Sequence, residues 1–581
     1  MNLPSPAIIA QSAVRRLPRL ALLLFGVAYV LPGFVGRGPW KSADITAFGV
    51  MQEMAATGSD WLQPGLMGQT AGFDSLLPYW LGAAAIQFLP FLDPAFAARL
   101  PYVLLLALTL LGTWYSVYYL ARSPQAQPVA FAFGGEAKPT DYARAIADAG
   151  LLALLACLGL AQLSHETTPA VAQLGFTTLM FYSVAASPYR SPWRVPGPAL
   201  AFVVGIVGLA LSGAPAVATL LGLGSVLVEW AHGRWGGEPN VRQPTDDERV
   251  QPDTRGWMLL MTLVTLGAAA LAYALGQWAW RIDIDALSQS TAHKEWGRIF
   301  RLLLWFPWPA WPLALWTLYR WRRQLASRHV ALPLLFAGVT IATTLLTAAL
   351  DRGLLLSLPP LATLAAFALP TLRRSVASLI DWFTLLFFTS CAIIIWVIWV
   401  AMQTGVPRQP AANVAKLVPG FEPGFSALAF GVALLATLGW AWLVKWRTGQ
   451  QRTALWKSLI LPAGGATLCW LLLMTLWLPV LDYARSYAPM ARQVARQVNP
   501  RACVEVLGLN NAQIAALRYH SQLDLQPADA KAACPYLVVN TSAVAGMGRT
   551  LELSDWERMI MVRRPADRTE NVVVFRRIQS Q

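Results

Sequence analysis

Thirteen long apolar runs determine what this chain can fold into. A helix needs about 20 predominantly apolar residues to cross the hydrocarbon core of a bilayer. The chain of 581 residues is 56% hydrophobic and 13% charged, and so carries roughly half the charged fraction of soluble proteins. The pattern predicts a polytopic α-helical membrane protein with about 13 transmembrane helices, at residues 19–36, 98–120, 149–164, 169–187, 197–212, 214–230, 257–279, 300–319, 331–350, 353–370, 380–402, 425–445 and 457–481.

The positions of Lys and Arg predict which side of the membrane each loop faces. The formal net charge of +15 is spread over short clusters in alternate connections, and such clusters face the cytoplasm. We therefore expect a cytoplasmic N-terminus, with the first loop (37–97) and everything after residue 481 on the outer side. Basic clusters between apolar runs are not the pattern of a nucleic-acid-binding surface, so we expect no nucleic acid partner.

The N-terminal end has basic residues before an apolar run, which is also the pattern of a cleaved signal peptide. Because no small-residue cleavage site stands out, we interpret residues 19–36 as an uncleaved first span. Residues 121–148 break the alternation of spans and loops, and we interpret them as an insertion or a cytoplasmic hairpin.

Residues 482–581 change in character and predict a small α/β domain outside the membrane, after a transmembrane domain at 1–481. The segments "CVEVLGL", "CPYLVVN", "RMIMVRR" and "NVVVFRRI" are typical of strands, and "NNAQIAALRYHS" is typical of a helix. Cys503 and Cys534 stand at strand edges, where they form either a disulfide, the pairing we expect in an oxidising compartment, or two free thiols. His520 is the one further soft ligand there, which argues against a metal site in this domain.

A polar stretch, "KSADITAFGVMQEMAATGSDWLQPGLMG", comes directly after the first run. Asp44 stands where a short helix begins. Its simplest role is to cap that helix, since Asp is favoured at a helix start, and the alternative is a role in catalysis. The apolar residues of the stretch recur at helical spacing and predict an amphipathic helix on the membrane surface: Ile45, Phe48, Met51 and Met54.

This stretch resembles the first loop of the bacterial lipid A aminoarabinose transferases and their relatives. The shared elements are Asp44, the segment "EMAATGSDWLQPGLMG", an acidic residue in "GFDSLLPYWL", and "AARLP" at the start of the second span. These relatives are glycosyltransferases of the GT-C fold that use polyprenyl-phosphate-linked sugars, with protein O-mannosyltransferases as more distant kin. The resemblance is specific over about residues 41–100 and elsewhere rests on the number of spans and on the outer C-terminal domain.

The resemblance implies that a monosaccharide passes from a polyprenyl-phosphate donor to an envelope acceptor, which is a lipid A-like molecule, a glycan or a protein. It also implies that this occurs among membrane lipids at the periplasmic face of a bacterial inner membrane, with Asp44 as the catalytic carboxylate. The chemistry agrees, because the acceptor hydroxyl needs a carboxylate to take its proton, whereas a phosphate leaves without a strong acid. Attack opposite the leaving phosphate would invert the anomeric centre.

The donor phosphate needs cations on the outer side, and Arg352 is the first candidate. Asp351 and Arg352 stand where a span emerges, before "LLLSLPPLATLAAFALP", which resembles an element that relatives place beside the donor phosphate. Arginine binds phosphate in a bidentate manner. The alternative is an interfacial pair between these two residues, or an arginine that only anchors the helix.

Two further outer segments carry weaker candidates. His165 and Glu166 end the third span in "LSHETTPAVAQL", where relatives have an acidic residue, and helix capping is the alternative. The polar residues at 281–301 can line a headgroup cavity or can simply be solvated. Among them, His293 is a candidate ligand for a divalent metal, and Lys294 is a candidate phosphate contact.

The first loop departs from the family pattern at several positions. The second acidic position is kept as Asp74, but the charged residues around the two carboxylates are lost. Relatives carry Glu, Arg-Tyr and Lys where this chain has Ile45, Ala47 with Phe48, and Ser75. The first loop therefore keeps the overall pattern of the family's site, but the side chains that would indicate its donor and acceptor differ.

Two other functions fit a chain of this composition. A transporter would place ionisable residues near the bilayer midplane and break spans in matching halves. Here the ionisable residues cluster at the outer ends of the spans and in the loops, no repeat between halves is visible, and a large outer domain is present. A non-catalytic relative that binds lipid-linked glycans is the second alternative.

Overall fold

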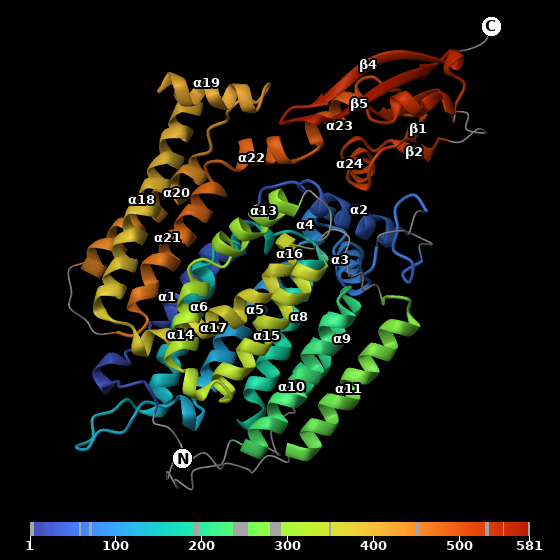
Figure 1. The fold of residues 1–581 in the computed structure, drawn as a ribbon. Coiled ribbons are helices and arrows are strands. Elements are labelled where there is room, and N and C mark those ends of the chain that lie inside the picture. Colours follow the sequence, from blue (N-terminus) through green and yellow to red (C-terminus); the bar gives the residue numbers. More distant parts are fainter. Residues whose placement is uncertain are drawn as a thin grey trace.

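We describe the protein from a computed structural model of the chain (Figure 1). It describes residues 5–56, 60–68, 73–189, 197–235, 254–278, 292–347, 350–448, 454–528, 534–549 and 551–578. Long helices run side by side as a bundle, and a small sheet lies at one end of it, near α2 and α3 (Figure 1). We call this the sheet end.

The regular structure of the apolar part of the chain is helical, as far as its described residues extend. Its helices, in chain order, are α1 (Arg19–Val30), α2 (Ala43–Ala55), α3 (Leu77–Phe88), α4 (Pro94–Ala97), α5 (Leu100–Ala121), α6 (Pro139–Ala156), α7 (Leu160–Leu163), α8 (Pro169–Ala186), α9 (Gly197–Leu211), α10 (Pro215–Trp235), α11 (Thr254–Ala274), α13 (Ala292–Trp305), α14 (Ala310–Arg320), α15 (Arg328–Leu346), α16 (Leu350–Gly353), α17 (Leu358–Ala368), α18 (Arg374–Thr404), α19 (Arg408–Leu417), α20 (Ala427–Thr448), α21 (Lys457–Leu473) and α22 (Leu478–Arg485).

The polytopic helical fold is confirmed, but the count of about thirteen spans is not. Among the described residues, eight helices are long and apolar enough to cross a membrane, or nine if the bent pair of α21 and α22 is one span. Two predicted spans are shorter helices, since α1 has 12 residues and α9 has 15. The run at 300–319 is divided between α13 and α14. The prolines at 307 and 309 lie at that break, where they cannot donate helical hydrogen bonds.

The prediction for residues 121–148 is wrong in its second half, because α6 already begins at Pro139. Proline at the first position and Asp141 in the first turn both suit a helix start. The two acidic residues of this helix, Asp141 and Asp148, interrupt its hydropathy, yet both have partners. Asp148 accepts hydrogen bonds from the Leu17 amide at 3.0 Å and from Trp114 Nε1 at 2.9 Å.

The first loop forms the predicted helix, α2, but the surroundings of that helix differ from the prediction. Its apolar residues are buried by protein instead of lying on the membrane surface. The Phe48 ring meets the edge of Tyr519 with centroids 4.8 Å apart. A Cβ atom at Gly49 would lie 2.5 Å from the Cβ of Ala515, so the two helices that carry these residues are in close contact.

The C-terminal region forms the predicted α/β domain. Its elements are α23 (Ala488–Ala495), β1 (Cys503–Leu507), α24 (Asn511–Ser521), β2 (Asp524–Pro527), β3 (Tyr536–Asn540), β4 (Trp556–Arg564) and β5 (Asp567–Arg577). The strand order is β2-β1-β3-β5-β4, with β1 parallel to both neighbours and β5 antiparallel to β3 and β4. The short strand β2 was not predicted. A disulfide joins Cys503 and Cys534, whose Cα atoms are 5.3 Å apart.

Ion pairs hold this domain on the first loop. Lys41 Nζ lies 2.6 Å from Asp567 Oδ2, at the turn between β4 and β5. Arg518 of α24 lies 2.6 Å from Glu53 of α2. The domain therefore covers the loop that carries Asp44.

Candidate active site

Asp44 is fully buried at the start of α2 and is surrounded by hydrogen-bond donors. Its Oδ2 accepts from Arg37 Nη1 at 2.6 Å and from the Trp40 amide at 3.0 Å. Its Oδ1 accepts from the amide and hydroxyl of Thr167, at 2.8 and 2.5 Å. These partners lie outside α2, so Asp44 ties the first loop to the α7–α8 connection and does not act as a simple helix cap.

Two buried arginines keep Asp44 ionised. Burial alone would raise the pKa of Asp44, but the charges of Arg37 and Arg99, with hydrogen bonds from Thr167 and Arg37, lower it from 3.8 to about 2. Arg99, in the "AARLP" segment, donates to the Arg37 carbonyl at 2.6 Å. Its Nη2 has no hydrogen-bond partner among the described residues. A carboxylate with so low a pKa is a weak base.

Glu166 and Arg352, two separate sequence candidates, form an ion pair. Arg352 Nη2 lies 2.7 Å from Glu166 Oε2; the Glu166 side chain is 3% exposed and that of Arg352 is 38% exposed. The other carboxylate oxygen, Oε1, has a long contact of 3.4 Å with Gln162 Nε2. Burial raises the pKa of Glu166, with a further rise from the charge of Asp44, and the charge of Arg352 opposes it. Arg352 thus pairs with Glu166, whereas the sequence alternative paired it with Asp351.

Arg485 and Asp482 of α22 complete this charged cluster, and sequence reasoning missed both. Arg485 lies over the Trp40 ring, with its guanidinium carbon 5.3 Å from the ring centroid. Its charge interacts with that of Glu166. Asp482 Oδ1 accepts from Trp40 Nε1 and from the Gly38 amide, both at 2.8 Å. The signal in the sequence was a pair of ionisable residues at the end of the last apolar run.

The charged cluster has more positive than negative groups. Four guanidinium groups face three carboxylates: Arg37, Arg99, Arg352 and Arg485 with Asp44, Glu166 and Asp482. In the described part of the chain, Arg352 Nε lacks a partner and the Arg485 guanidinium makes no hydrogen bond or ion pair. Buried or half-buried cations without full compensation attract an anion.

His165 lies beside the cluster but is enclosed by aromatic rings. Its ring lies 4.7 Å from that of Trp470 and 4.9 Å from that of Phe34. Its Nε2 contacts the Tyr29 carbonyl at 3.0 Å, and burial lowers its pKa from 6.5 to about 4. Its own carbonyl accepts from Arg37 Nη2 at 2.6 Å. The side chain packs as a neutral group, and the backbone positions Arg37.

The remaining candidates do not join these residues. Asp74 is exposed and lies beside the α9–α10 turn, where a Cβ at Gly213 would come within 2.6 Å of its carbonyl. Asp351 is also exposed. The side chains of His293 and Lys294, in α13, lie outside the described residues. Within the described ranges, no group of three or more His, Cys, Asp or Glu residues could hold a metal ion.

The protein is a polytopic helical membrane protein with a charged cluster at its first loop and a small α/β domain at one end of the bundle. A comparison with solved structures identifies its fold. The crystal structure of ArnT from Cupriavidus metallidurans bound to undecaprenyl phosphate matches with a TM-score of 0.59 and 16% identity, over 96% of this chain and 96% of that chain. ArnT in the apo state matches with a TM-score of 0.54 and 17% identity, again over 96% of both chains. No protein-family model and no curated protein matches the sequence. The chain has the GT-C fold.

Proposed function

We propose that this protein is an integral-membrane glycosyltransferase that moves a monosaccharide from a polyprenyl-phosphate donor to an envelope acceptor. The charged cluster carries the proposal. A phosphodiester-linked donor bears one negative charge, and the cluster has one more guanidinium group than carboxylates. The likeness in fold to ArnT, which was crystallised with undecaprenyl phosphate, supports the choice of a lipid phosphate over other anions.

In this proposal the arginines and carboxylates have separate tasks. Arg352 and Arg485 hold the donor phosphate, because each has donors that the described protein groups leave unused. The acceptor hydroxyl gives its proton to a carboxylate as it attacks the anomeric carbon, and the sugar–phosphate bond breaks on the opposite face. The sequence assigned that carboxylate as Asp44. Glu166 is a second candidate, because its pKa is raised and one of its oxygens is only weakly bonded.

We further propose the membrane and the orientation that the sequence predicts. The chain lies in the inner membrane of a bacterium, with a cytoplasmic N-terminus and its C-terminal domain in the periplasm. The sheet end of the bundle is then the periplasmic end. Attack opposite the leaving phosphate gives inversion at the sugar.

Donor binding tests the proposal. We expect Arg352→Ala to weaken binding of undecaprenyl phosphate by roughly tenfold or more, since a hydrogen bond to a charged group contributes about 1.5–3 kcal/mol. The measurement is native mass spectrometry of the detergent-solubilised full chain titrated with the lipid.

Arg323→Ala is the matched control, because Arg323 is an exposed arginine in the turn after α14. It should bind the lipid like the wild type. If Arg352→Ala binds undecaprenyl phosphate as tightly as the wild type, Arg352 only anchors its helix. If the wild type does not bind the lipid, the proposed function is wrong.

A further inference from the structure

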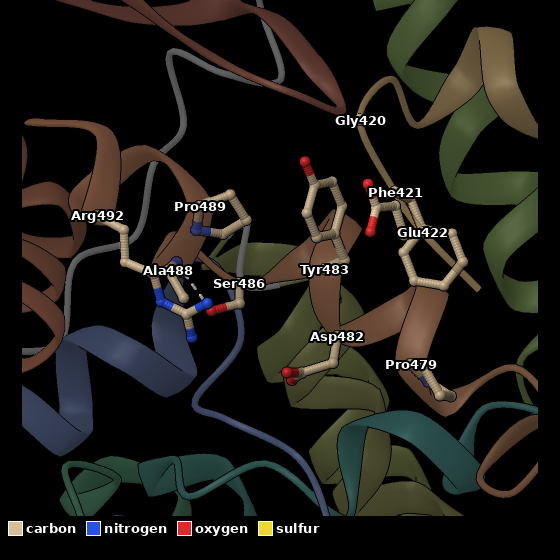
Figure 2. A pocket seen from close by; sticks show the side chains of 10 residues that line it. All are labelled: Gly420, Phe421, Glu422, Pro479, Asp482, Tyr483, Ser486, Ala488, Pro489 and Arg492. Atoms are coloured by element: carbon tan, nitrogen blue, oxygen red, sulfur yellow. Dashed lines mark hydrogen bonds between the residues drawn. The ribbon is translucent and has the colours of Figure 1, made fainter. Parts of the chain in front are cut away.

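A cavity of about 340 Å³ opens at the sheet end of the protein, and Asp482 of the charged cluster is one of the residues that line it (Figure 2). Three segments enclose it: the turn before α20, helix α22 and the first turn of α23. Its lining residues include Phe421, Glu422, Asp482, Tyr483, Ser486 and Arg492. Its volume is within the range of small-molecule sites, which begins near 300 Å³.

The lining combines aromatic and charged groups. The rings of Phe421 and Tyr483 meet edge to face, with centroids 5.7 Å apart. Glu422 lies next to them, and Arg492 and Asp482 point toward the space between them from opposite sides (Figure 2). In the described part of the chain, no hydrogen bond or ion pair uses the Arg492 guanidinium. The cavity therefore offers an apolar wall, two carboxylates that accept hydrogen bonds, and a guanidinium that donates them.

Asp482 connects this cavity to the charged cluster. One of its oxygens accepts from Trp40 Nε1 and the Gly38 amide, both at 2.8 Å. The amide of the same Trp40 donates to Asp44. Trp40 thus links Asp44 to Asp482, and so to a molecule that touches Asp482 in the cavity. Arg485, on the same helix as Asp482, interacts with the charge of Glu166.

We propose that this cavity is the subsite for the saccharide of the acceptor, which makes the acceptor a glycan. The inference rests on the proposed glycosyl transfer and adds the chemical class of the second substrate. A pyranose has an apolar C–H face, which packs on an aromatic ring as other apolar surfaces do. Its hydroxyl groups donate to carboxylates and accept from a guanidinium. A peptide acceptor would need backbone partners along an extended groove or sheet edge, whereas this site is a compact cavity lined by side chains.

Saturation-transfer-difference NMR on the detergent-solubilised full chain tests the inference. The probes are lactose and N,N'-diacetylchitobiose, and we expect transfer to their ring protons in the wild type. Phe421→Ala and Glu422→Gln should each raise the dissociation constant of the saccharides by roughly tenfold, as expected when an aromatic stacking surface or a charged hydrogen bond is lost. Neither residue belongs to the charged cluster, so binding of undecaprenyl phosphate should be unchanged in both variants.

Two matched controls accompany these variants. Phe425→Ala removes an exposed ring four positions further along the chain, and Glu552→Gln removes an exposed carboxylate in the C-terminal domain. Both should leave saccharide binding unchanged.

The outcomes separate this inference from the proposed function. Binding of undecaprenyl phosphate without saccharide transfer, or transfer that Phe421→Ala and Glu422→Gln leave intact, would overturn the cavity assignment alone. A Phe421-dependent signal from a Ser- and Thr-containing peptide in place of the saccharides would also overturn it. If the wild type binds saccharide but not undecaprenyl phosphate, the assignment of the cavity stands and the proposed donor is wrong.

Discussion

Asp44 and Glu166 are neighbouring carboxylates in opposite electrostatic environments. Asp44 accepts four hydrogen bonds and two arginine charges act on it, which lowers its pKa to about 2. Glu166 has one arginine partner and a buried carboxylate, and its pKa is raised. When two titratable groups have pKa values pushed apart, the group with the higher value is the better proton acceptor near neutral pH. In the proposed transfer we therefore expect Glu166 to act as the base and Asp44 to position Arg37 and Thr167.

The pH dependence of transfer distinguishes the two roles. If Glu166 takes the proton, the rate rises with pH through a value above 4.5, because only the ionised carboxylate acts as a base and its pKa is raised. If Asp44 takes it, the rate shows no acidic limb above pH 4, because Asp44 is ionised down to about pH 2. We expect an acidic limb in kcat/KM measured from pH 4 to 8. We also expect Glu166→Gln to lower kcat by about 10²–10⁴-fold.

Arg352→Lys provides the control for this assignment. It keeps the positive charge beside Glu166 but loses the bidentate fork, so the acidic limb should stay near its wild-type position while donor affinity falls. Arg352→Ala removes the charge that opposes the rise in the pKa of Glu166, and should move the limb to higher pH. A limb that does not respond to Arg352→Ala would contradict the assignment to Glu166.

The sequence predicted single members of the site better than their pairing. Asp44 and Arg352 stand in recognisable segments, and Glu166 stands at the end of an apolar run. Nothing in the spacing places Glu166 opposite Arg352, because 186 positions separate them and the contact depends on helix packing. Arg485 was missed for the same reason. Its partner, Trp40, belongs to the other end of the chain.

Among the elements of the fold, the contact between α2 and α24 links the candidate site to the C-terminal domain. Gly49 permits this contact, since any side chain there would meet Ala515. The ion pair between Glu53 and Arg518 lies on the same two helices. Helical spacing predicted α2 correctly, but hydropathy could not distinguish a face covered by lipid from one covered by protein, because both are apolar.

Gly49→Ala tests the contact between α2 and α24. The new Cβ would lie 2.5 Å from that of Ala515, and overpacking of this kind costs about 1–3 kcal/mol. We expect faster hydrogen exchange in the amides of residues 511–521 and a lower rate of transfer. The measurement is hydrogen–deuterium exchange of the full chain by mass spectrometry.

Gly267→Ala is the matched control for that experiment. Gly267 also lies within a helix, α11, but a Cβ there meets nothing within 4 Å. Both variants gain the same helix propensity, about 1 kcal/mol, so a difference between them isolates the contact with Ala515. Equal exchange in the two proteins would mean that α24 is free to move away from α2.

For the whole molecule, the orientation in the membrane decides in which compartment the proposed transfer takes place. The sequence predicted it from basic clusters and an odd number of spans, but the described residues contain eight or nine full-length candidates, with α1 and α9 as shorter apolar helices. Counting spans therefore cannot decide the orientation. The disulfide between Cys503 and Cys534 gives an independent argument, because disulfides persist in oxidising compartments and are rare in the cytosol.

Reporter fusions decide the orientation directly. Alkaline phosphatase becomes active only where its own disulfides form. Fused after Ile578, at the end of the described sheet domain, it should be active, and fused after Gln324, in a basic connection, it should be inactive. A thiol-specific maleimide added to spheroplasts should then label Cys503 and Cys534 only after reduction. The reverse pattern of activity would place the charged cluster in the cytoplasm, and the proposed transfer at the periplasmic face would be wrong even if the site binds a lipid phosphate.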